Sequence, residues 1–360
     1  MSALNVKMGY VDKTVDAHYG DDHLYSVWMK DNDLYKGQVL FTTEAPMGNV
    51  AQVPDDNKYI LSQRTIAFVP DRRVISDNFL AVVLSASKCQ KSLINRASGG
   101  TAKGVSQKTL SEISLDIPQS LSEQDKVSEL IKKLSKIITL HQRKLDNLKL
   151  KKKALLQKLF PKNGERYPEL RFPGFTDAWE QRELGEIFEY LQNNTLSRDS
   201  LNYKNPNIKN IHYGDILVKF DEILDGSNKD IPYINSELDL SKFSKSLLQD
   251  GDIIFSDTAE DDTVGKAIEL QNVNAPFILS GLHTIPCRPL IRFGKGYLGN
   301  FLNSDSYRMQ LRPLVQGIKV SSISKSALKD TMIEYPKNLD EQEKIGSLFY
   351  HIAKMITLHQ

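Results

Sequence analysis

Residues 118–142 read PQSLSEQDKVSELIKKLSKIITLHQ, and residues 336–360 read PKNLDEQEKIGSLFYHIAKMITLHQ, so one segment occurs twice at an offset of 218. The match continues backwards more faintly, and the runs 37–41 and 251–255 resemble each other at an offset of 214. Self-similarity over a long, fixed period indicates a duplicated structural unit. We therefore interpret the chain as two copies of one unit, each a variable globular part followed by a well-matched helix.

The first copy of the repeated segment predicts one long helix over residues 122–160. Ser122 is the expected N-cap, and Pro161 ends the helix. Apolar or near-apolar residues recur in the four-and-three spacing of a coiled-coil seam, with one gap at Lys152. The seam residues are Val127, Ile131, Leu134, Ile138, His141, Leu145, Leu148, Leu155 and Leu159. We expect the helix to pair antiparallel with its copy at 340–360; the alternative is that each helix packs only on its own globular part.

Positive charge is concentrated on this helix. Residues 122–160 contain eleven Lys or Arg and four Asp or Glu, a net charge of +7. Because the whole chain carries +2, the remainder carries −5. A basic run can attract the phosphate backbone of nucleic acid, whereas a lysine-rich helix face can equally be an ordinary solvated surface.

The globular parts are predicted to be mixed α/β (α+β). Short β-branched and aromatic runs predict strands at 38–42, 113–117, 252–256 and 331–335. Longer runs predict helices at 79–97 and 297–314. The fold class is therefore two mixed α/β domains separated by long helices that form an antiparallel coiled coil.

The expected domain organisation follows from the repeat and from a segment rich in Pro and Gly. We divide the chain into a first domain (1–120), a central helix (121–160), a linker (161–178), a second domain (179–338) and a C-terminal helix (339–360). The offset of 218 leaves the opening part of the second domain without a counterpart, so we expect a first domain that is incomplete at its N-terminus.

Composition bounds the cellular context. Apolar residues are 40% and charged residues 26% of the chain, which is ordinary for a globular protein. No apolar run has the length of a membrane span, and the first 20 residues lack the pattern of a signal peptide. The two cysteines lie far apart, at Cys89 and Cys287, and outside metal-ligand spacing. We expect a cytoplasmic protein that contacts no membrane.

Residues 138–187 carry a resemblance to a known family. This junction, ITLHQRKLDNLKLKKKALLQKLFPKNGERYPELRFPGFTDAWEQRELGEI, closely resembles the central conserved region of type I restriction–modification specificity subunits. IPQSLSEQDKV (117–127) and its echo YPKNLDEQEKI (335–345) look like the element that follows each target-recognition domain of that family. SGGTAKGVSQKTL (98–110) and NIHYGDILVKF (210–220) also resemble segments of such domains.

The resemblance implies a function. Each of the two globular parts would be a target-recognition domain that reads one half of a split double-stranded DNA sequence. The conserved helices would fix the gap between the halves and dock two modification subunits, which bind S-adenosylmethionine and methylate adenine. Restriction (motor-nuclease) subunits, which use ATP and Mg, would complete the assembly.

The residues themselves indicate no catalytic site. The run 99–106 approaches a P-loop, but Lys103 precedes the second glycine and Val105 occupies the place of the lysine that binds phosphate. No Asn/Asp-Pro-Pro-aromatic motif is present, and the seven histidines do not fall into metal-ligand spacing. His141 and His359 occupy matching seam positions, where packing is the favoured role. We predict no catalytic, metal-binding or cofactor-binding residue in this chain.

Candidate DNA contacts lie in loops that combine polar or basic side chains with glycine. Side chains reach base edges, whereas Lys and Arg on phosphates fix the register. In the first domain we select Gln63, Arg64, Arg96, Thr101, Lys103 and Ser106. In the second domain we select Lys209, Tyr213, Lys219, Arg312, Gln316, Lys319 and Ser321.

Three functions compete on the sequence. The favoured one is a noncatalytic specificity subunit that reads a bipartite DNA target and scaffolds its partner subunits. The second is a protein-interaction scaffold whose domains no longer read DNA. The third is a self-sufficient nuclease or methyltransferase, against which the absent motifs argue. Salt-dependent affinity for duplex DNA separates the first two.

Overall fold

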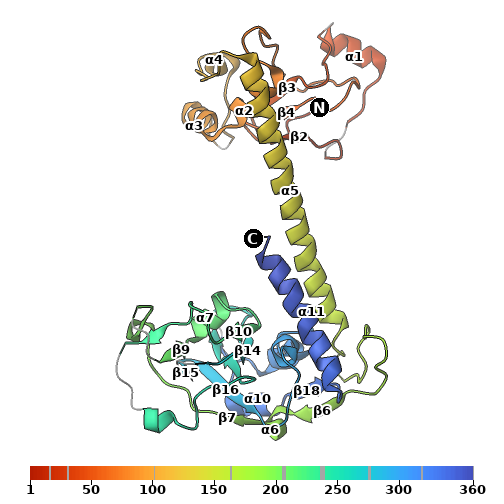
Figure 1. The fold of residues 1–360 in the computed structure, drawn as a ribbon. Coiled ribbons are helices and arrows are strands. Elements are labelled where there is room, and N and C mark those ends of the chain that lie inside the picture. Colours follow the sequence, from red (N-terminus) through yellow and green to blue (C-terminus); the bar gives the residue numbers. More distant parts are fainter. Residues whose placement is uncertain are drawn as a thin grey trace. The chain divides into compact units, whose positions relative to one another are not determined.

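The computed structural model divides into two compact units, residues 1–140 and 141–360, which are described separately below. The residues that it describes are 1–15, 18–30, 32–100, 102–162, 164–204, 208–235, 240–274, 277–317 and 319–359. The division between the units falls inside the long helix α5 (Leu121–Lys158; Figure 1). The predicted domain boundaries are finer than this division and stay predictions.

The first unit is built on a small antiparallel sheet of order β4-β3-β5. Val39 and Phe41 on its central strand are fully buried and pack with Leu80 and Leu93 from two helices. Its elements are β1 (Val6–Lys7), β2 (Tyr10–Val11), α1 (Asp22–Met29), β3 (Val39–Thr42), β4 (Val50–Gln52), β5 (Thr65–Ala67), α2 (Asp77–Ser85), α3 (Ser87–Arg96) and α4 (Gln107–Ser111).

The second unit contains a five-stranded sheet of order β10-β14-β12-β16-β7 and a four-stranded sheet of order β15-β9-β11-β8. Its largest core cluster includes Trp179, Tyr297 and Phe301. The first elements are β6 (Glu180–Glu183), α6 (Leu184–Ile187), β7 (Phe188–Tyr190), η1 (Arg198–Ser200), β8 (Leu201–Asn202), β9 (Lys209–Ile211), α7 (Tyr213–Val218), β10 (Ile223–Asp225), β11 (Tyr233–Ile234), η2 (Leu240–Phe243) and β12 (Ile253–Ser256). The remaining elements are β13 (Thr258–Ala259), β14 (Ala267–Gln271), β15 (Ile278–Ser280), β16 (Thr284–Pro289), α8 (Tyr297–Phe301), α9 (Asp305–Leu311), η3 (Arg312–Leu314), β17 (Ser321–Ser322), α10 (Lys325–Lys329), β18 (Met332–Tyr335) and α11 (Leu339–Thr357).

The duplication seen in the sequence is present in the strand pairing. Phe41 on β3 lies between Val50 and Ile66, and Phe255 on β12 lies between Ala267 and Ile285 in the same antiparallel arrangement. Strand order β4-β3-β5 therefore corresponds to β14-β12-β16. The mixed α/β fold class and the repeated unit are confirmed.

The strand predicted at 113–117 is wrong, although its counterpart β18 is confirmed. β18 pairs along its whole length with β6, from Glu183 to Glu180. Residues 113–117 adopt no strand and pair with none among the described residues. A strand needs a neighbouring strand to satisfy its backbone groups, and β18 has one in β6.

The long central helix is confirmed as α5, with a start that differs from the prediction. It begins at Leu121, and Ser120 caps it, since its Oγ accepts a bond from the Glu123 amide at 3.4 Å. Ser122 is therefore not the N-cap. The 38 residues give a helix about 57 Å long at 1.5 Å per residue.

A buried glutamine at the fourth position of each repeated helix anchors that helix to its globular part. The Oε1 of Gln124 accepts a bond from the Ser76 amide at 3.0 Å, and the Oε1 of Gln342 accepts one from the Gly294 amide at 2.7 Å. Each Nε2 donates to the carbonyl of the proline six residues earlier, at 2.8 and 2.7 Å. These pairs obey the offset of 218, so the repeat preserves an interaction and not merely a pattern.

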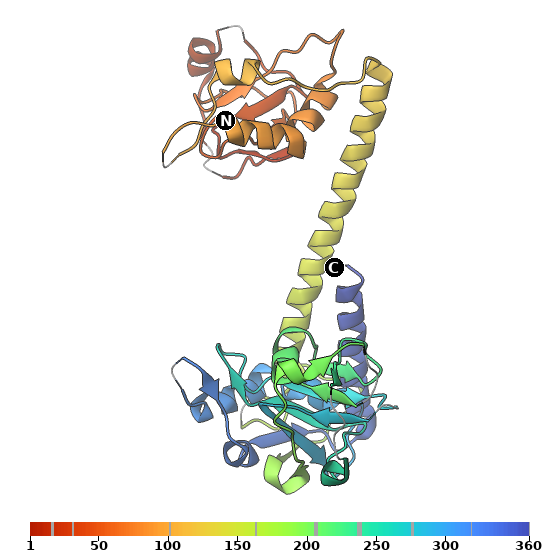
Figure 2. The ribbon, with the colours of Figure 1, turned by 90° about the vertical axis from the view of Figure 1, so that its left-hand side faces the viewer.

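Helix α11 runs antiparallel to the C-terminal half of α5 within the second unit (Figures 1 and 2). The Nδ1 atoms of His141 and His359 lie 3.0 Å apart at one end, and the rings of Phe160 and Phe349 stack at 6.1 Å near the other. The predicted antiparallel pairing is thus confirmed for this half. Phe349 also belongs to the core of its own globular part, so the alternative arrangement holds for α11 as well.

The gap in the predicted seam has a structural cause. Lys152 is largely buried, and its Nζ donates to both carboxylate oxygens of Glu222 at 2.7 and 2.8 Å. A charge buried in this way is tolerated because it is paired and hydrogen-bonded. The polar seam residue therefore joins α5 to the second domain.

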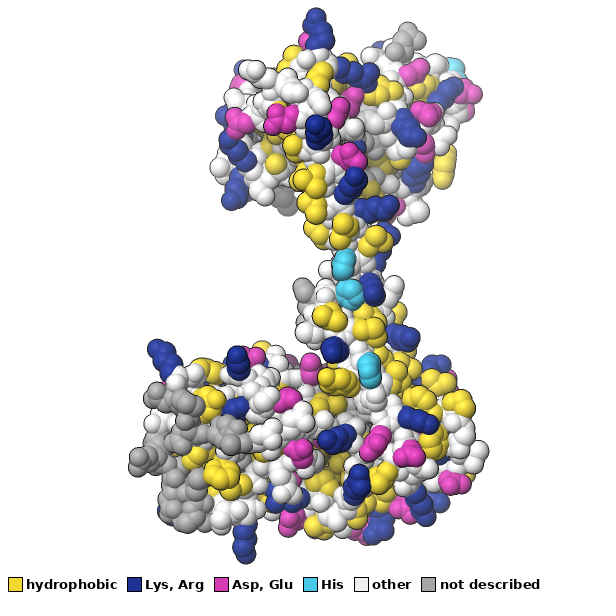
Figure 3. Space-filling model, viewed as in Figure 1, with side chains coloured by type: hydrophobic (Ala, Val, Ile, Leu, Met, Phe, Trp, Pro, Cys, Tyr) yellow, Lys and Arg dark blue, Asp and Glu magenta, His cyan; other side chains and the backbone are white. Residues whose placement is uncertain are grey.

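Of the seam residues that precede His141, Val127 is half-buried, whereas Ile131, Leu134 and Ile138 are exposed. Leu134 is 46% and Ile138 is 68% accessible, and apolar side chains are visible along this helix in Figure 3.

No helix among the described residues is long and apolar enough to cross a membrane.

We predict that Phe160→Ala destabilises the second unit by about 3–5 kcal/mol, because the ring is fully buried among aromatic residues. Leu150→Ala, on the exposed surface of α5, should change stability by less than about 0.5 kcal/mol. Urea unfolding followed by the fluorescence of buried Trp179, in a Trp28→Phe background, measures both. Equal effects would show that α5 is not anchored through Phe160.

Candidate nucleic-acid interface

Each unit contains the same tight hairpin turn, and the two turns obey the offset of 218. In the first unit Ser98 and Gly104 exchange backbone hydrogen bonds of 3.0 and 2.9 Å. In the second unit Gln316 and Ser322 exchange bonds of 2.9 and 2.7 Å. We call the segments 98–104 and 316–322 the paired turns; Thr101 and Ile318 within them lie outside the described residues.

One glycine in each paired turn is required by the backbone. Gly99 has φ +117° and Gly317 has φ +108°, a region that L side chains rarely adopt. A Cβ atom on Gly99 would lie 2.3 Å from the Ala102 carbonyl oxygen, and one on Gly317 would lie 2.0 Å from that of Val320. The two copies therefore need glycine at the same place for the same reason.

Each paired turn is joined to the end of the central strand of its sheet. The Val105 amide donates to the Thr43 carbonyl at 2.9 Å, and the Ile323 amide donates to the Asp257 carbonyl at 2.9 Å. β17 extends this contact in the second unit by pairing with β13. The hydrogen bond between the turn and the strand end therefore joins a segment repeated at the offset of 218 to one repeated at the offset of 214.

A third segment completes each site. The Thr43 amide donates to the Arg64 carbonyl at 2.9 Å, and the Asp257 amide donates to the His283 carbonyl at 3.1 Å. Arg64 and His283 therefore occupy equivalent positions. The Nε of Arg64 lies 3.5 Å from a Glu44 carboxylate oxygen, and the Nδ1 of His283 lies 3.3 Å from one of Asp257.

The second site has an aromatic neighbour at the start of α7. The ring of Tyr213 meets the ring of His283 edge-on, with centroids 5.2 Å apart, and lies beside His212 at 4.6 Å. His212 caps the helix, since its Nδ1 accepts a bond from the Gly214 amide. Burial, followed by the nearby charge of Arg198, lowers the pKa of His212, so this ring is held neutral as a structural cap.

Most of the predicted DNA contacts lie on or beside the paired turns. Lys103 and Gln316 belong to the turns and are exposed, as is Lys319. Ser321 is half-buried on β17. Gln63 and Arg64 are exposed beside the first turn. Thr101 lies outside the described residues.

Three other predicted contacts flank the turns on helices. Ser106 caps α4, because its Oγ accepts a bond from the Thr109 amide at 3.0 Å. Arg96, in the last turn of α3, lies 3.6 Å from a Glu112 carboxylate oxygen. Arg312 is exposed in η3, shortly before the second turn.

Of the two lysines predicted in and beside the segment 210–220, Lys209 is buried and Lys219 is exposed. Lys209 is buried, and its Nζ donates to the carbonyls of Gly226 and Asn228 at 2.6 and 3.1 Å. The Nζ of Lys219 lies 2.9 Å from the Tyr203 hydroxyl and 3.1 Å from the buried Asp215 carboxylate. We therefore leave Lys209 out of the candidate interface.

Sequence reasoning missed four residues of the interface: Glu44, Asp257, Thr258 and His283. Extending the match between 37–41 and 251–255 by three positions would have aligned Glu44 with Thr258. His283 aligns with Arg64 only at an offset of 219, which the strand pairing of Thr284 and Thr65 reveals. The sequence alone does not indicate this change of the offset from 218 to 219.

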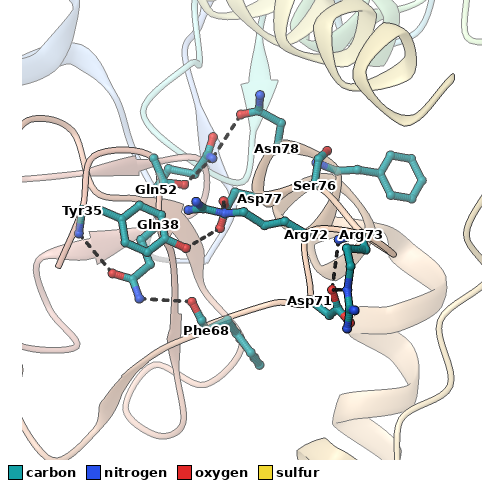
Figure 4. Close-up of polar contacts among 12 residues, drawn as sticks. Tyr35, Gln38, Gln52, Phe68, Asp71, Arg72, Arg73, Ser76, Asp77 and Asn78 are labelled. Atoms are coloured by element: carbon teal, nitrogen blue, oxygen red, sulfur yellow. Dashed lines mark hydrogen bonds and ion pairs between the residues drawn. The ribbon is translucent and has the colours of Figure 1, made fainter. Parts of the chain in front are cut away.

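A separate polar cluster lies near the start of α2 in the first unit (Figure 4). The Asp77 carboxylate accepts bonds from the Tyr35 hydroxyl at 2.7 Å and from the Nε of Arg72 at 3.0 Å. The Arg72 guanidinium also covers the Tyr35 ring at 4.5 Å. Gln38 bonds the Tyr35 amide and the Phe68 carbonyl, so this cluster ties loops of the domain together.

Comparison with known families agrees with the repeated architecture. A model of the type I restriction modification DNA specificity domain matches residues 24–150 and 176–360, one match for each copy. These matches cover most of the chain. The chain belongs to this family, as the junction at 138–187 predicted, and its role is in the DNA-sequence specificity of type I restriction–modification.

Solved structures of similar proteins match the chain at low sequence identity. The type I restriction-modification S subunit from M. genitalium matches with a TM-score of 0.50 and 13% identity, over 91% of this chain and 78% of that one. The HsdS subunit from Thermoanaerobacter tengcongensis matches with 0.46 and 18%, over 91% and 75%. A chain from work on complex assembly and conformational transition of the type I R-M system matches with 0.48 and 17%, over 91% and 76%.

We predict that Gly317→Ala opens the second paired turn, because a Cβ there overlaps a backbone carbonyl at an unfavourable φ. Hydrogen–deuterium exchange of the Ser322 amide, which bonds Gln316, should accelerate about tenfold or more. Gly100→Ala, in the first turn, is the control and is read at the Gly104 amide that bonds Ser98, since a Cβ at Gly100 meets nothing within 4 Å. Unchanged protection of Ser322 would mean that glycine is not needed for the turn.

Proposed function

We propose that each of the two domains reads one half of a bipartite duplex DNA target. One observation carries the proposal: the same turn, strand end and flanking segment are built twice with identical backbone hydrogen bonds. The exposed side chains on this shared frame differ between the copies. A protein that reads two different half-sites needs a common frame with different contacts.

The paired turns have the properties of a DNA-contacting loop. Each presents backbone with little side-chain cover at its glycine, and each carries one exposed lysine, Lys103 or Lys319. Lysines on phosphates fix register and raise affinity without specifying sequence. Sequence then depends on neighbouring side chains that reach base edges.

The partners follow from the family and from the exposed seam of α5. We propose that two modification subunits, which bind S-adenosylmethionine, dock on the chain, and that restriction subunits with ATP and Mg join them. Apolar side chains such as Leu134 and Ile138, which the described residues leave accessible, offer a surface for docking. In this proposal the chain works in the cytoplasm, supplies specificity and scaffolding, and contributes no catalytic group.

A salt titration tests whether the turn lysines contact phosphates. Lys103→Ala and Lys319→Ala should each weaken duplex binding about equally for all sequences, and each should lower the slope of log K against log salt by about one. Fluorescence anisotropy of the chain with its modification subunit measures both. Lys88→Ala, at the opposite end of α3 from the first turn, should leave the slope unchanged. Slopes that stay constant in both turn variants would exclude phosphate contacts there.

The length of α5 tests the bipartite arrangement. Inserting four helix-forming residues after Leu140 lengthens the helix by about 6 Å, which is one to two base-pair steps of about 3.4 Å. The methylation motif of the complex, read by sequencing of modified DNA, should keep both half-sites and gain one or two unread pairs. A matched exchange of four residues without insertion is the control. An unchanged gap in an active complex would contradict the proposal.

A further inference from the structure

We infer that Arg64 and His283 are the equivalent base-reading residues of the two domains, Arg64 selecting guanine in one half-site and His283 a base with an exocyclic amine in the other. This inference rests on the proposed function. It adds which residues discriminate and which bases they select.

The equivalence of the two residues comes from the backbone. Each residue's carbonyl accepts the amide of the residue after its central strand, Thr43 or Asp257. The carbonyl of that same residue accepts the first amide beyond the paired turn. Arg64 and His283 thus occupy equivalent positions in the two copies, but one side chain is a guanidinium and the other an imidazole.

Both side chains are accessible and both are oriented by a neighbour. The side chains of Arg64 and His283 are 58% and 47% exposed. A carboxylate lies beside the Nε of Arg64, from Glu44, and another lies beside the Nδ1 of His283, from Asp257. A readout side chain needs this combination of reach and fixed direction, because a freely rotating one loses entropy on binding.

Arg64 has the donor pattern that recognises guanine. Its Nε faces Glu44 at 3.5 Å, so the two terminal nitrogens of the guanidinium remain as a fork. Such a fork donates to the O6 and N7 atoms of guanine, which is the commonest specific contact in the major groove. Lys103, in the adjoining turn, is a point charge that matches no base pattern.

His283 presents an acceptor instead. The Thr258 hydroxyl lies 2.7 Å from the Asp257 carboxylate, to which it donates its single hydrogen. The His283 Nδ1 lies 3.4 Å from the Thr258 oxygen and 3.3 Å from an Asp257 carboxylate oxygen, and a hydrogen on Nδ1 suits both acceptors. In the uncharged form of this tautomer, Nε2 carries no hydrogen and is an acceptor.

An acceptor in the major groove selects the bases that offer an amine there. These are adenine, through N6, and cytosine, through N4. His283 also has a backbone φ of +55°, an uncommon conformation for a residue other than glycine. Such conformations cluster at binding sites, and the Tyr213 ring against His283 limits its motion further.

The experiment exchanges the two side-chain types in the full chain, assembled with its modification subunit. Arg64→Gln and His283→Arg are the main variants. His283→Asn is the second variant at that position, because asparagine tolerates the left-handed backbone. Arg73→Gln and His23→Asn, at exposed positions away from the paired turns, are matched controls. The readout is the methylated motif in a randomised duplex library.

The expected results are single-base changes confined to one half-site each. Arg64→Gln should move one position of one half from guanine to adenine, the base that glutamine reads. His283→Arg should move one position of the other half to guanine, and His283→Asn should move it to adenine. Preference should shift about ten- to a hundredfold at the affected position, with both controls and the gap unchanged.

Several results would overturn the inference. A wild-type motif retained by active Arg64 and His283 variants would do so while leaving the bipartite proposal intact. For a variant that no longer methylates, binding selection on the same library decides. A uniform loss over all sequences indicates a phosphate contact and overturns the inference, whereas altered preference at one position supports it. A wild-type motif that is not bipartite would overturn the proposed function and this inference with it.

Discussion

The attachment of each repeated helix to its globular part is the constraint on which the rest of the structure depends. Gln124 and Gln342 are buried, and each joins the helix to a loop amide and to a proline carbonyl. A buried amide side chain is costly unless its partners are in place. The helix can therefore begin only where the domain offers these partners, and this fixes where the helix leaves its domain.

The second anchor of α5 is apolar. Phe160 is fully buried and meets Trp179, Tyr297 and Phe349. Lys152, nearer the middle of α5, adds an ion pair with Glu222. The linker contributes as well, because Arg171 makes a bidentate pair with buried Glu341 at the start of α11, at 2.7 and 2.8 Å. The second domain thus holds α5 and α11 together through separate apolar and polar contacts.

Much of the architecture was predictable from the sequence, because long-range repetition and helical periodicity are directly recognisable in the order of the residues. The duplicated helix, its antiparallel partner and the family all follow from 118–142, 336–360 and 138–187. The candidate contacts selected from glycine-containing loops include residues of both paired turns, where the backbone requires glycine at Gly99 and Gly317.

The remainder depended on contacts that no local pattern records. The strand predicted at 113–117 has no partner strand among the described residues, and the propensity of those residues cannot reveal this. Lys209 looks like a surface lysine in sequence but is buried against carbonyls. His283 aligns with Arg64 only after a shift of one residue, which is visible in strand register alone.

Site-specific photocrosslinking tests the central claim, that two equivalent turns contact the two halves of one DNA target. A photoreactive residue would replace Ala102 in one protein and Lys319 in another, each complexed with the modification subunit on a duplex that carries the methylated motif. We predict that Ala102 and Lys319 crosslink to opposite half-sites and not to the intervening pairs. Crosslinks from both positions to the same half, or to neither while DNA stays bound, would contradict the account.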